Sequence, residues 1–332
     1  MTGLKDNFLR VIDYLRVSVT DRCNLRCLYC MPPDGVVPSE HKDILTYEEI
    51  VRVVKIGAGL GVRKVRLTGG EPLTRKNIVF LISAIKKIPG IEDLSLTTNG
   101  ILLEKYGMEI AAAGLNRVNI SIDSFNPVRY GEITRGGDLD AVLRGLSTAE
   151  KAGLRPIKIN MVPIRGVNDD EILDFARLTL DSEYHVRFIE FMPSGNNDYW
   201  SPDKYITTDE LRKKIETIAQ LSPVRMRKDG PSRYFRLTGA KGVIGFISAL
   251  THHFCGDCNR LRLTSDGKLR PCLFSETEID LRAVMRSGEP DSEIERLLRL
   301  SIEIKPEGHN MALIGPAALD PNRRRPMSKI GG

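Results

Sequence analysis

The stretch YLRVSVTDRCNLRCLYC, residues 14–30, decides the fold because it joins a strand pattern to a cysteine loop. Its first half alternates, so Arg16, Ser18 and Thr20 share one face of a predicted strand while Val17 and Val19 share the other. The second half holds the cysteines Cys23, Cys27 and Cys30. A loop that follows a parallel strand lies at the barrel end where such folds place their chemistry.

Outward from this stretch, strand-like and helical segments alternate six times between residues 14 and 192. The predicted strands lie near residues 14–20, 62–68, 91–97, 116–122, 155–162 and 184–191. Helices are expected at Tyr47–Leu60 and Asn168–Leu180 among others. A closed barrel needs about eight such units. We therefore expect an α/β fold, a partial six-unit TIM-like barrel of parallel strands.

After Met192 the pattern changes to a Pro/Gly/Asn-rich stretch, a helix near 208–220 and strands near 232–238 and 241–248. This predicts a smaller C-terminal α+β region packed against the barrel. The expected domains are residues 7–225, the barrel, and 226–332, which ends in Gly331-Gly332. The polar tail from Arg323 is expected to be mobile.

Several predicted strands carry polar side chains on one face, whereas parallel strands covered on both faces are usually apolar throughout. The polar sets are Lys64, Arg66 and Thr68; Ser95 and Thr97; Asn119, Ser121 and Asp123; and Lys158 and Asn160. In the sixth strand Arg187 and Glu190 fall on opposite faces, because one has an odd and the other an even residue number. Unpaired buried cations are too costly for an ordinary core, so the lumen should hold an anion. The alternative is an antiparallel sheet with one wet face.

The six cysteines form two triplets, Cys23/Cys27/Cys30 and Cys255/Cys258/Cys272, neither of which can pair internally. Clustered cysteines of this kind favour metal binding. Three thiolates can hold three irons of a four-iron cluster and leave the fourth open. Zinc is the alternative for both triplets, and His252 or His253 could complete a Cys3His site in the second. There Arg260 and Arg262 favour an anion clamp beside a cluster.

The C-x3-C-x2-C pattern, with Tyr29 before its last cysteine, resembles the radical S-adenosylmethionine (SAM) enzymes. In that superfamily a reduced cluster splits SAM into methionine and a 5′-deoxyadenosyl radical. The segment Thr68-Gly69-Gly70-Glu71-Pro72 follows the second strand, where the resemblance implies a motif that holds the SAM amino group. Its glycines allow close backbone approach, and a carboxylate can pair with an ammonium group.

With both triplets, the Asn259–Arg262 segment and the terminal Gly-Gly, nearly the whole chain resembles the GTP 3′,8-cyclase family, also called the molybdenum cofactor biosynthesis protein A family. The resemblance implies a lyase with two [4Fe-4S] clusters and SAM. Hydrogen is removed from C3′ of GTP, and the new carbon radical attacks C8. The product is 3′,8-cyclo-7,8-dihydro-GTP, formed in the first step of molybdenum cofactor biosynthesis, and the second cluster binds the guanine edge.

The resemblance also assigns roles to single residues. Cys23, Cys27, Cys30, Arg260 and Arg262 are implied to be catalytic, and all six cysteines are metal ligands. The SAM contacts are Tyr29, Gly69, Gly70, Glu71, Ser121 and Met192. The GTP contacts are Arg16, Lys64, Arg66, Thr97, Lys158, Arg187, Arg260, Leu261 and Arg262. The family needs the tail near the active site.

Composition and missing motifs narrow the function further. The net charge of +6 suits an anionic small molecule and falls short of a dedicated nucleic-acid binder. No P-loop is present, and Gly57-Ala-Gly59-Leu-Gly61 follows a helix and is expected to end it. The longest apolar run, Val243–Leu250, is too short to cross a membrane, and residues 1–10 lack a signal-peptide core, so the cytoplasm is expected.

The expected partners are GTP, an electron donor, the downstream cyclic pyranopterin monophosphate synthase and a second copy in a homodimer, with neither nucleic acid nor membrane. Two other functions stay open. One is a radical SAM enzyme that acts on a peptide, which the cations disfavour. The other is a zinc protein that binds nucleic acid, for which an aromatic content of 6% offers few stacking surfaces.

Overall fold

Twelve strands form one curved sheet in the computed structural model, which describes residues 3–193, 199–226, 230–309 and 325–331. The first six strands are β1 (Tyr14–Ser18), β2 (Lys64–Thr68), β3 (Asp93–Thr98), β4 (Arg117–Ser121), β5 (Lys158–Met161) and β6 (His185–Ile189). They pair in sequence order, all in parallel, so the predicted α/β partial barrel is confirmed and the antiparallel alternative is wrong.

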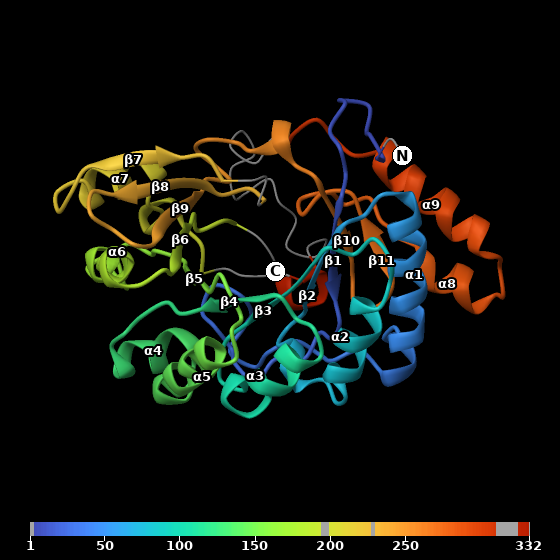
Figure 1. Cartoon of the computed structure of the whole chain (residues 1–332), viewed down its shortest axis with the longest axis horizontal. Coiled ribbons are helices and arrows are strands. Elements are labelled where there is room, and N and C mark those ends of the chain that lie inside the picture. The colour runs from blue at the N-terminus through green and yellow to red at the C-terminus, as the bar shows by residue number, and fades with distance from the viewer. Residues whose placement is uncertain (1–2, 194–198, 227–229, 310–324, 332) are drawn as a thin grey trace.

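Helices cover the outer face of this sheet (Figure 1). Those that connect its strands are α1 (Tyr47–Leu60), α2 (Ile78–Lys86), α3 (Leu103–Ala112), α4 (Pro127–Thr134), α5 (Leu139–Lys151) and α6 (Ile172–Asp181). The apolar strand residues Val17, Val65 and Leu94 are fully buried in the core, as are Ile50 and Val53 of α1. The polar residues of alternate parity therefore point to the inside of the curve.

Helix α1 has the predicted bounds because both of its ends carry clear signals. Thr46 and Glu49 form a reciprocal capping box at its start. Gly61 ends the helix with a φ of 111°, a left-handed conformation that favours glycine, as expected for this segment.

Helix α6 begins later than predicted, at Ile172 rather than Asn168. The Asn168 side chain accepts a hydrogen bond from the Ile164 backbone and donates to the Asp123 carbonyl oxygen. A short polar side chain used in this way stabilises a turn rather than a helix.

The C-terminal region contains β7 (Leu221–Val224), β8 (Arg233–Leu237), β9 (Val243–Ile247), β10 (Arg260–Leu263), β11 (Lys268–Arg270) and β12 (Ile279–Asp280). Its helices are α7 (Thr208–Ile215), α8 (Leu281–Arg286), α9 (Asp291–Glu303) and α10 (Met327–Ile330). The predicted strands and α7 are confirmed, although α7 ends five residues before the predicted residue 220.

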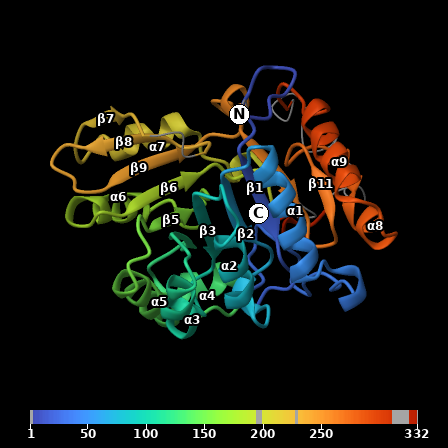
Figure 2. The same cartoon turned by 45° about the vertical axis from the view of Figure 1, so that its right-hand side comes forward.

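This region does more than pack against the barrel, because its strands continue the same sheet. β9 pairs with β6 and β10 pairs with β1, both in parallel, while the outermost strands at each edge are antiparallel. α8 and α9 lie beside β11 (Figure 2). β7 and β8 pair across the expected domain boundary at 225/226, which stays a prediction.

Candidate active site

One cavity of about 300 Å3 runs along the inner face of the parallel strands, and both cysteine triplets line it, the first after the carboxyl end of β1 and the second beside the amino end of β10. The cysteines are free, and each is partly buried. The two groups are more than 220 residues apart in sequence. They line one cavity because β1 and β10 are parallel neighbours in the sheet, with the first triplet after the carboxyl end of β1 and the second before the amino end of β10.

The first cysteine loop, between β1 and α1, is fixed against the end of α4. Arg26 and Leu28 donate backbone hydrogen bonds to the carbonyl oxygens of Thr134 and Ile133. The Arg135 guanidinium donates to the carbonyl oxygens of Arg26 and Met31. These contacts direct three thiols into one cavity, the requirement for a cluster bound by three cysteines.

Burial raises the pKa of the Cys23 thiol to about 11 and of the Cys30 thiol to about 12. The pKa of Cys27 is also well above its ordinary value, because the thiol is buried and lies close to Cys30. Three adjacent buried thiolates need a cationic partner. The loop therefore fits an iron-sulfur cluster, whose irons supply that charge.

Gly69 and Gly70 bring β2 close to the cysteine loop. A Cβ atom at Gly69 would lie 2.4 Å from the Thr20 carbonyl oxygen, and one at Gly70 would lie 2.3 Å from that of Arg22. Gly70 donates its backbone hydrogen bond to Thr20, with a length of 2.8 Å. Gly69 and Gly70 thus hold the segment after β2 against the cysteine loop after β1, and both glycines line the cavity.

Glu71, the expected ammonium partner, is not among the residues that line the cavity. Its buried carboxylate accepts hydrogen bonds from the backbones of Leu73 and Asn99, at 3.0 and 2.7 Å, and from the Thr98 hydroxyl, at 2.8 Å. Burial raises its pKa to about 7. Through these bonds Glu71 holds together the loops that follow β2 and β3.

The other expected SAM contacts, Tyr29, Ser121 and Met192, line the cavity. The Tyr29 hydroxyl donates a 2.6 Å hydrogen bond to Asp123. Asp123 also accepts from the backbone of Val162, and burial raises its pKa to about 6. Asp123 thus links the cysteine loop to the ends of β4 and β5.

The second triplet begins in the short helix η4 (Cys255–Asp257) and ends at Cys272 after β11. Burial opposes ionisation of Cys258, but Arg260 and Lys305 overcome it and lower its pKa to about 6. The Lys305 ammonium donates to the carbonyl oxygens of Arg260 and Pro271, at 2.9 and 2.6 Å. Thiols that share a cavity wall with buried cations fit a cluster that binds an anionic substrate.

Register places three arginines side by side between the triplets. Arg16 of β1 pairs with Arg262 of β10 on one side and with Arg66 of β2 on the other. All three are buried and line the cavity. Burial and the neighbouring Arg260 lower the pKa of Arg262 to about 9. Because adjacent guanidiniums repel one another, this row is suited to an anionic ligand.

Of the other expected GTP contacts, Thr97, Arg187 and Arg260 line the cavity. Lys64, Lys158 and Leu261 do not. Lys64 lies 3.5 Å from Asp13 in an ion pair, and the fully buried Lys158 lies 3.4 Å from the Tyr234 hydroxyl. Leu261 faces the apolar core because it alternates with the two arginines.

The C-terminal segment lies inside the curve of the sheet, next to β1 (Figure 1), so the expectation of a mobile tail is wrong for residues 325–331. Met327 lines the cavity, and the Arg262 guanidinium donates a 2.8 Å hydrogen bond to the Gly331 carbonyl oxygen. Arg325 anchors the segment through Asp266 at 2.7 Å. Arg323, Arg324 and Gly332 lie outside the described residues.

Sequence reasoning gave no role to several residues of this site, among them Asp123, Lys305 and His309. The parity of β4 placed Asp123 on the inner face, but its partner Tyr29 is 94 residues away. Lys305 and His309 follow α9, and no local pattern marks them. Their positions follow from tertiary packing.

The family comparisons agree with this geometry. The chain matches the Radical SAM superfamily over residues 17–179 and the family Molybdenum Cofactor Synthesis C over residues 184–311. The crystal structure of Streptococcus suis SuiB bound to S-adenosylmethionine has a similar fold, with a TM-score of 0.59 and 16% identity over 86% of this chain and 67% of that chain.

Two curated proteins are similar over their full lengths. GTP 3',8-cyclase of Thermodesulfovibrio yellowstonii is 50% identical, covering 99% of this chain and 100% of its own. The protein of the same name from Alkaliphilus metalliredigens is also 50% identical, with the same coverage.

The partial barrel and the cysteine loop after β1 define a radical SAM enzyme. The chain belongs to the GTP 3′,8-cyclase family of molybdenum cofactor biosynthesis. Among the described residues, no helix is both long and apolar enough to cross a membrane.

Proposed function

We propose that this enzyme converts GTP to 3′,8-cyclo-7,8-dihydro-GTP, the first step of molybdenum cofactor biosynthesis. The observation that carries the proposal is the row formed by Arg262, Arg16 and Arg66 between the two cysteine triplets of one cavity. A substrate bound there can reach both triplets at once.

The charges of the cavity favour a nucleoside triphosphate. Arg187 and Arg260 also line it, so five arginines give the cavity a positive charge that suits an anionic substrate. The sequence has no P-loop, so side-chain cations must hold the phosphates. A neutral peptide would not match the positive charge of this cavity, which disfavours a peptide-modifying enzyme.

SAM would lie beside the first cysteine loop. Gly69, Gly70, Ser121 and Met192 are within the same cavity and would contact its amino acid and adenosyl groups. Glu71 would act through the loop backbone that it holds. The Tyr29–Asp123 hydrogen bond would fix the end of the cysteine loop.

Cys23, Cys27 and Cys30 would hold the radical-forming cluster, and Cys255, Cys258 and Cys272 an auxiliary [4Fe-4S] cluster. When bound, the first cluster and SAM supply the radical that removes hydrogen from C3′ of GTP. Arg260 and Arg262 would orient the guanine at the auxiliary triplet while Arg16 and Arg66 hold the phosphates. This fixed orientation brings C3′ and C8 into a reactive arrangement.

The reaction also implies partners. A one-electron donor must reduce the first cluster, and cyclic pyranopterin monophosphate synthase would consume the product. A homodimer and a cytoplasmic location complete the proposal. A zinc-containing nucleic-acid binder is the competing function, and the metal content separates the two.

Anaerobic turnover with GTP, SAM and a reductant tests the proposal. We expect 5′-deoxyadenosine together with cyclised guanosine triphosphate, from brown protein with roughly eight irons per chain. Colourless protein that contains zinc and forms neither product would contradict it.

A further inference from the structure

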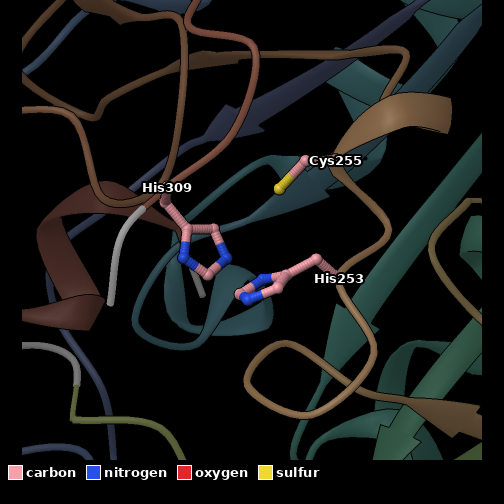
Figure 3. A group of neighbouring side chains, drawn as sticks. All are labelled: His253, Cys255 and His309. Carbon is pink, nitrogen blue, oxygen red and sulfur yellow. The ribbon is translucent and has the colours of Figure 1, made fainter. Parts of the chain in front are cut away.

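The side chains of His253, Cys255 and His309 converge on one point (Figure 3). Their metal-ligating atoms all lie within 4.8 Å of one another. The two imidazole rings meet edge to face, with centroids 4.7 Å apart, and the Cys255 sulfur points toward them. Among the residues that the structure describes, this is the one such group of possible metal ligands.

A buried arginine holds together the two segments that carry these ligands. The Arg10 guanidinium donates to the Cys255 carbonyl oxygen at 2.7 Å and to that of Glu307 at 2.8 Å. Its charge is balanced by Asp6, 2.6 Å away, and both side chains are nearly inaccessible to solvent. The His309 backbone also donates a hydrogen bond to the Cys255 sulfur. The contacts of Arg10 thus hold the two segments together without using a ligand atom.

His253 and His309, the two histidines of the group, have different surroundings from the neighbouring His252. His309 packs on Phe274 with ring centroids 4.5 Å apart, which restricts the position of its ring. His252, next in sequence to His253, turns outward and lies 3.1 Å from the Asp209 carboxylate. The sequence offered His252 or His253 as a zinc ligand, and the structure brings only His253 close to Cys255.

We propose that His253, Cys255 and His309 form a site for a single Zn²⁺ ion in chains that lack the auxiliary cluster. Two imidazoles and one thiolate are the ligand types that zinc prefers, and a water can take the fourth position because His253 is exposed. Bonds of about 2.0–2.3 Å separate tetrahedral ligand atoms by roughly 3.3–3.8 Å, so small ring rotations close the site.

This site and the auxiliary cluster exclude each other because both require Cys255. Zinc bound here would withhold one of the three thiolates from the cluster. The inference rests on the proposed auxiliary cluster only for this consequence, since zinc binding itself needs no cluster. A zinc-loaded chain would keep its first cluster and fail to acquire the second.

Cobalt titration of the cluster-free full-length protein tests the site. The Cys23→Ala/Cys27→Ala/Cys30→Ala background removes the other triplet, and circular dichroism checks that it folds. We expect one Co²⁺ per chain, with tetrahedral ligand-field bands and a thiolate charge-transfer band that Zn²⁺ displaces. His309→Ala should weaken binding by more than about 100-fold, since even outer-shell partners are worth about 10- to 100-fold.

Two matched variants make the result specific. His252→Ala removes the neighbouring histidine and should leave cobalt affinity unchanged, and Cys272→Ala should do the same. Loss of binding in Cys272→Ala with full binding in His309→Ala would overturn the proposal in favour of a site built on the cysteine triplet. If the triple-alanine background does not fold, His309→Ala and His252→Ala in the unaltered chain should differ by one bound cobalt.

Zinc X-ray absorption gives an independent reading of the ligands. We expect one sulfur at about 2.3 Å and nitrogen or oxygen at about 2.0–2.1 Å, whereas three sulfurs would refute the site. Prior zinc loading should also block reconstitution of the auxiliary cluster in the triple-alanine background, and His309→Ala should relieve the block. Reconstitution that fails without zinc would count against the proposed auxiliary cluster, not against the zinc site.

Discussion

Arg262 of β10 donates a 2.8 Å hydrogen bond to the carbonyl oxygen of Gly331, next to the last residue of the chain. The same arginine lies beside Arg16 in the cationic row that lines the cavity. The C-terminus therefore helps to set the position of a proposed substrate contact.

Gly331→Ala should disturb this arrangement. Gly331 has a φ of +82°, and a Cβ atom there would lie 2.7 Å from Thr68 Cγ2. We expect a turnover rate at least about tenfold lower, because small displacements of a positioned group are costly. Gly288→Ala is the control, since Gly288 has a φ of +83° with no atom near its Cβ position. Both variants lose about 1 kcal/mol of stability to backbone strain, and equal turnover in the two would contradict the account.

Arg66→Ala should weaken GTP binding by about 10- to 150-fold, about 1.5–3 kcal/mol, through loss of a charge-assisted contact. Calorimetry with GTP under anaerobic conditions measures this effect. Arg117→Ala serves for comparison, because Arg117 pairs with Asp93 at 2.6 Å and does not line the cavity. Unchanged GTP affinity in Arg66→Ala would show that Arg66 does not bind the phosphates.

Cys27→Ser and Cys258→Ser should separate the work of the two triplets. Each variant should retain roughly four irons per chain. Cys27→Ser should stop SAM cleavage, whereas Cys258→Ser should still form 5′-deoxyadenosine without cyclised product. Electron paramagnetic resonance identifies the remaining cluster, and the same lost signal in both variants would contradict the assignment.

Glu71 should make stability depend on pH. Its pKa rises from 4.5 to about 7 on burial, so the folded state holds a proton that the unfolded state releases. Stability contributed by this group is therefore full below about pH 4.5 and is lost as the pH rises toward 7. The loss is about 3.5 kcal/mol, at about 1.4 kcal/mol per pKa unit. Urea unfolding of the wild type and of Glu71→Gln should diverge over this range, and parallel pH profiles would refute the assignment.

The alternation of residues in the strands predicted which side chains face the inside of the barrel, because parity alone determines the face. Parity does not determine depth along the barrel axis. Lys64 and Lys158 have the predicted parity, yet Lys64 pairs with Asp13 and Lys158 is buried beside Tyr234. Depth depends on strand register, which the sequence pattern leaves open.

The cysteine spacing predicted two metal sites, and neighbouring strands β1 and β10 explain why they share a cavity. The residues that hold these two sites in position could not be predicted from the sequence. Arg10 contacts Cys255 across 245 residues, and Lys305 contacts Arg260 after a separate helix, so neither pair has a local signature. The expectation of a mobile tail is wrong for residues 325–331 for the same reason, since Arg325 pairs with the distant Asp266.

Turnover of GTP deuterated at C3′, with SAM and a reductant under anaerobic conditions, tests the central claim most directly. The cavity geometry predicts that deuterium appears in 5′-deoxyadenosine and that the guanosine triphosphate product is cyclised. Formation of 5′-deoxyadenosine without deuterium, or of none at all, would contradict a substrate held by the arginine row between the two triplets.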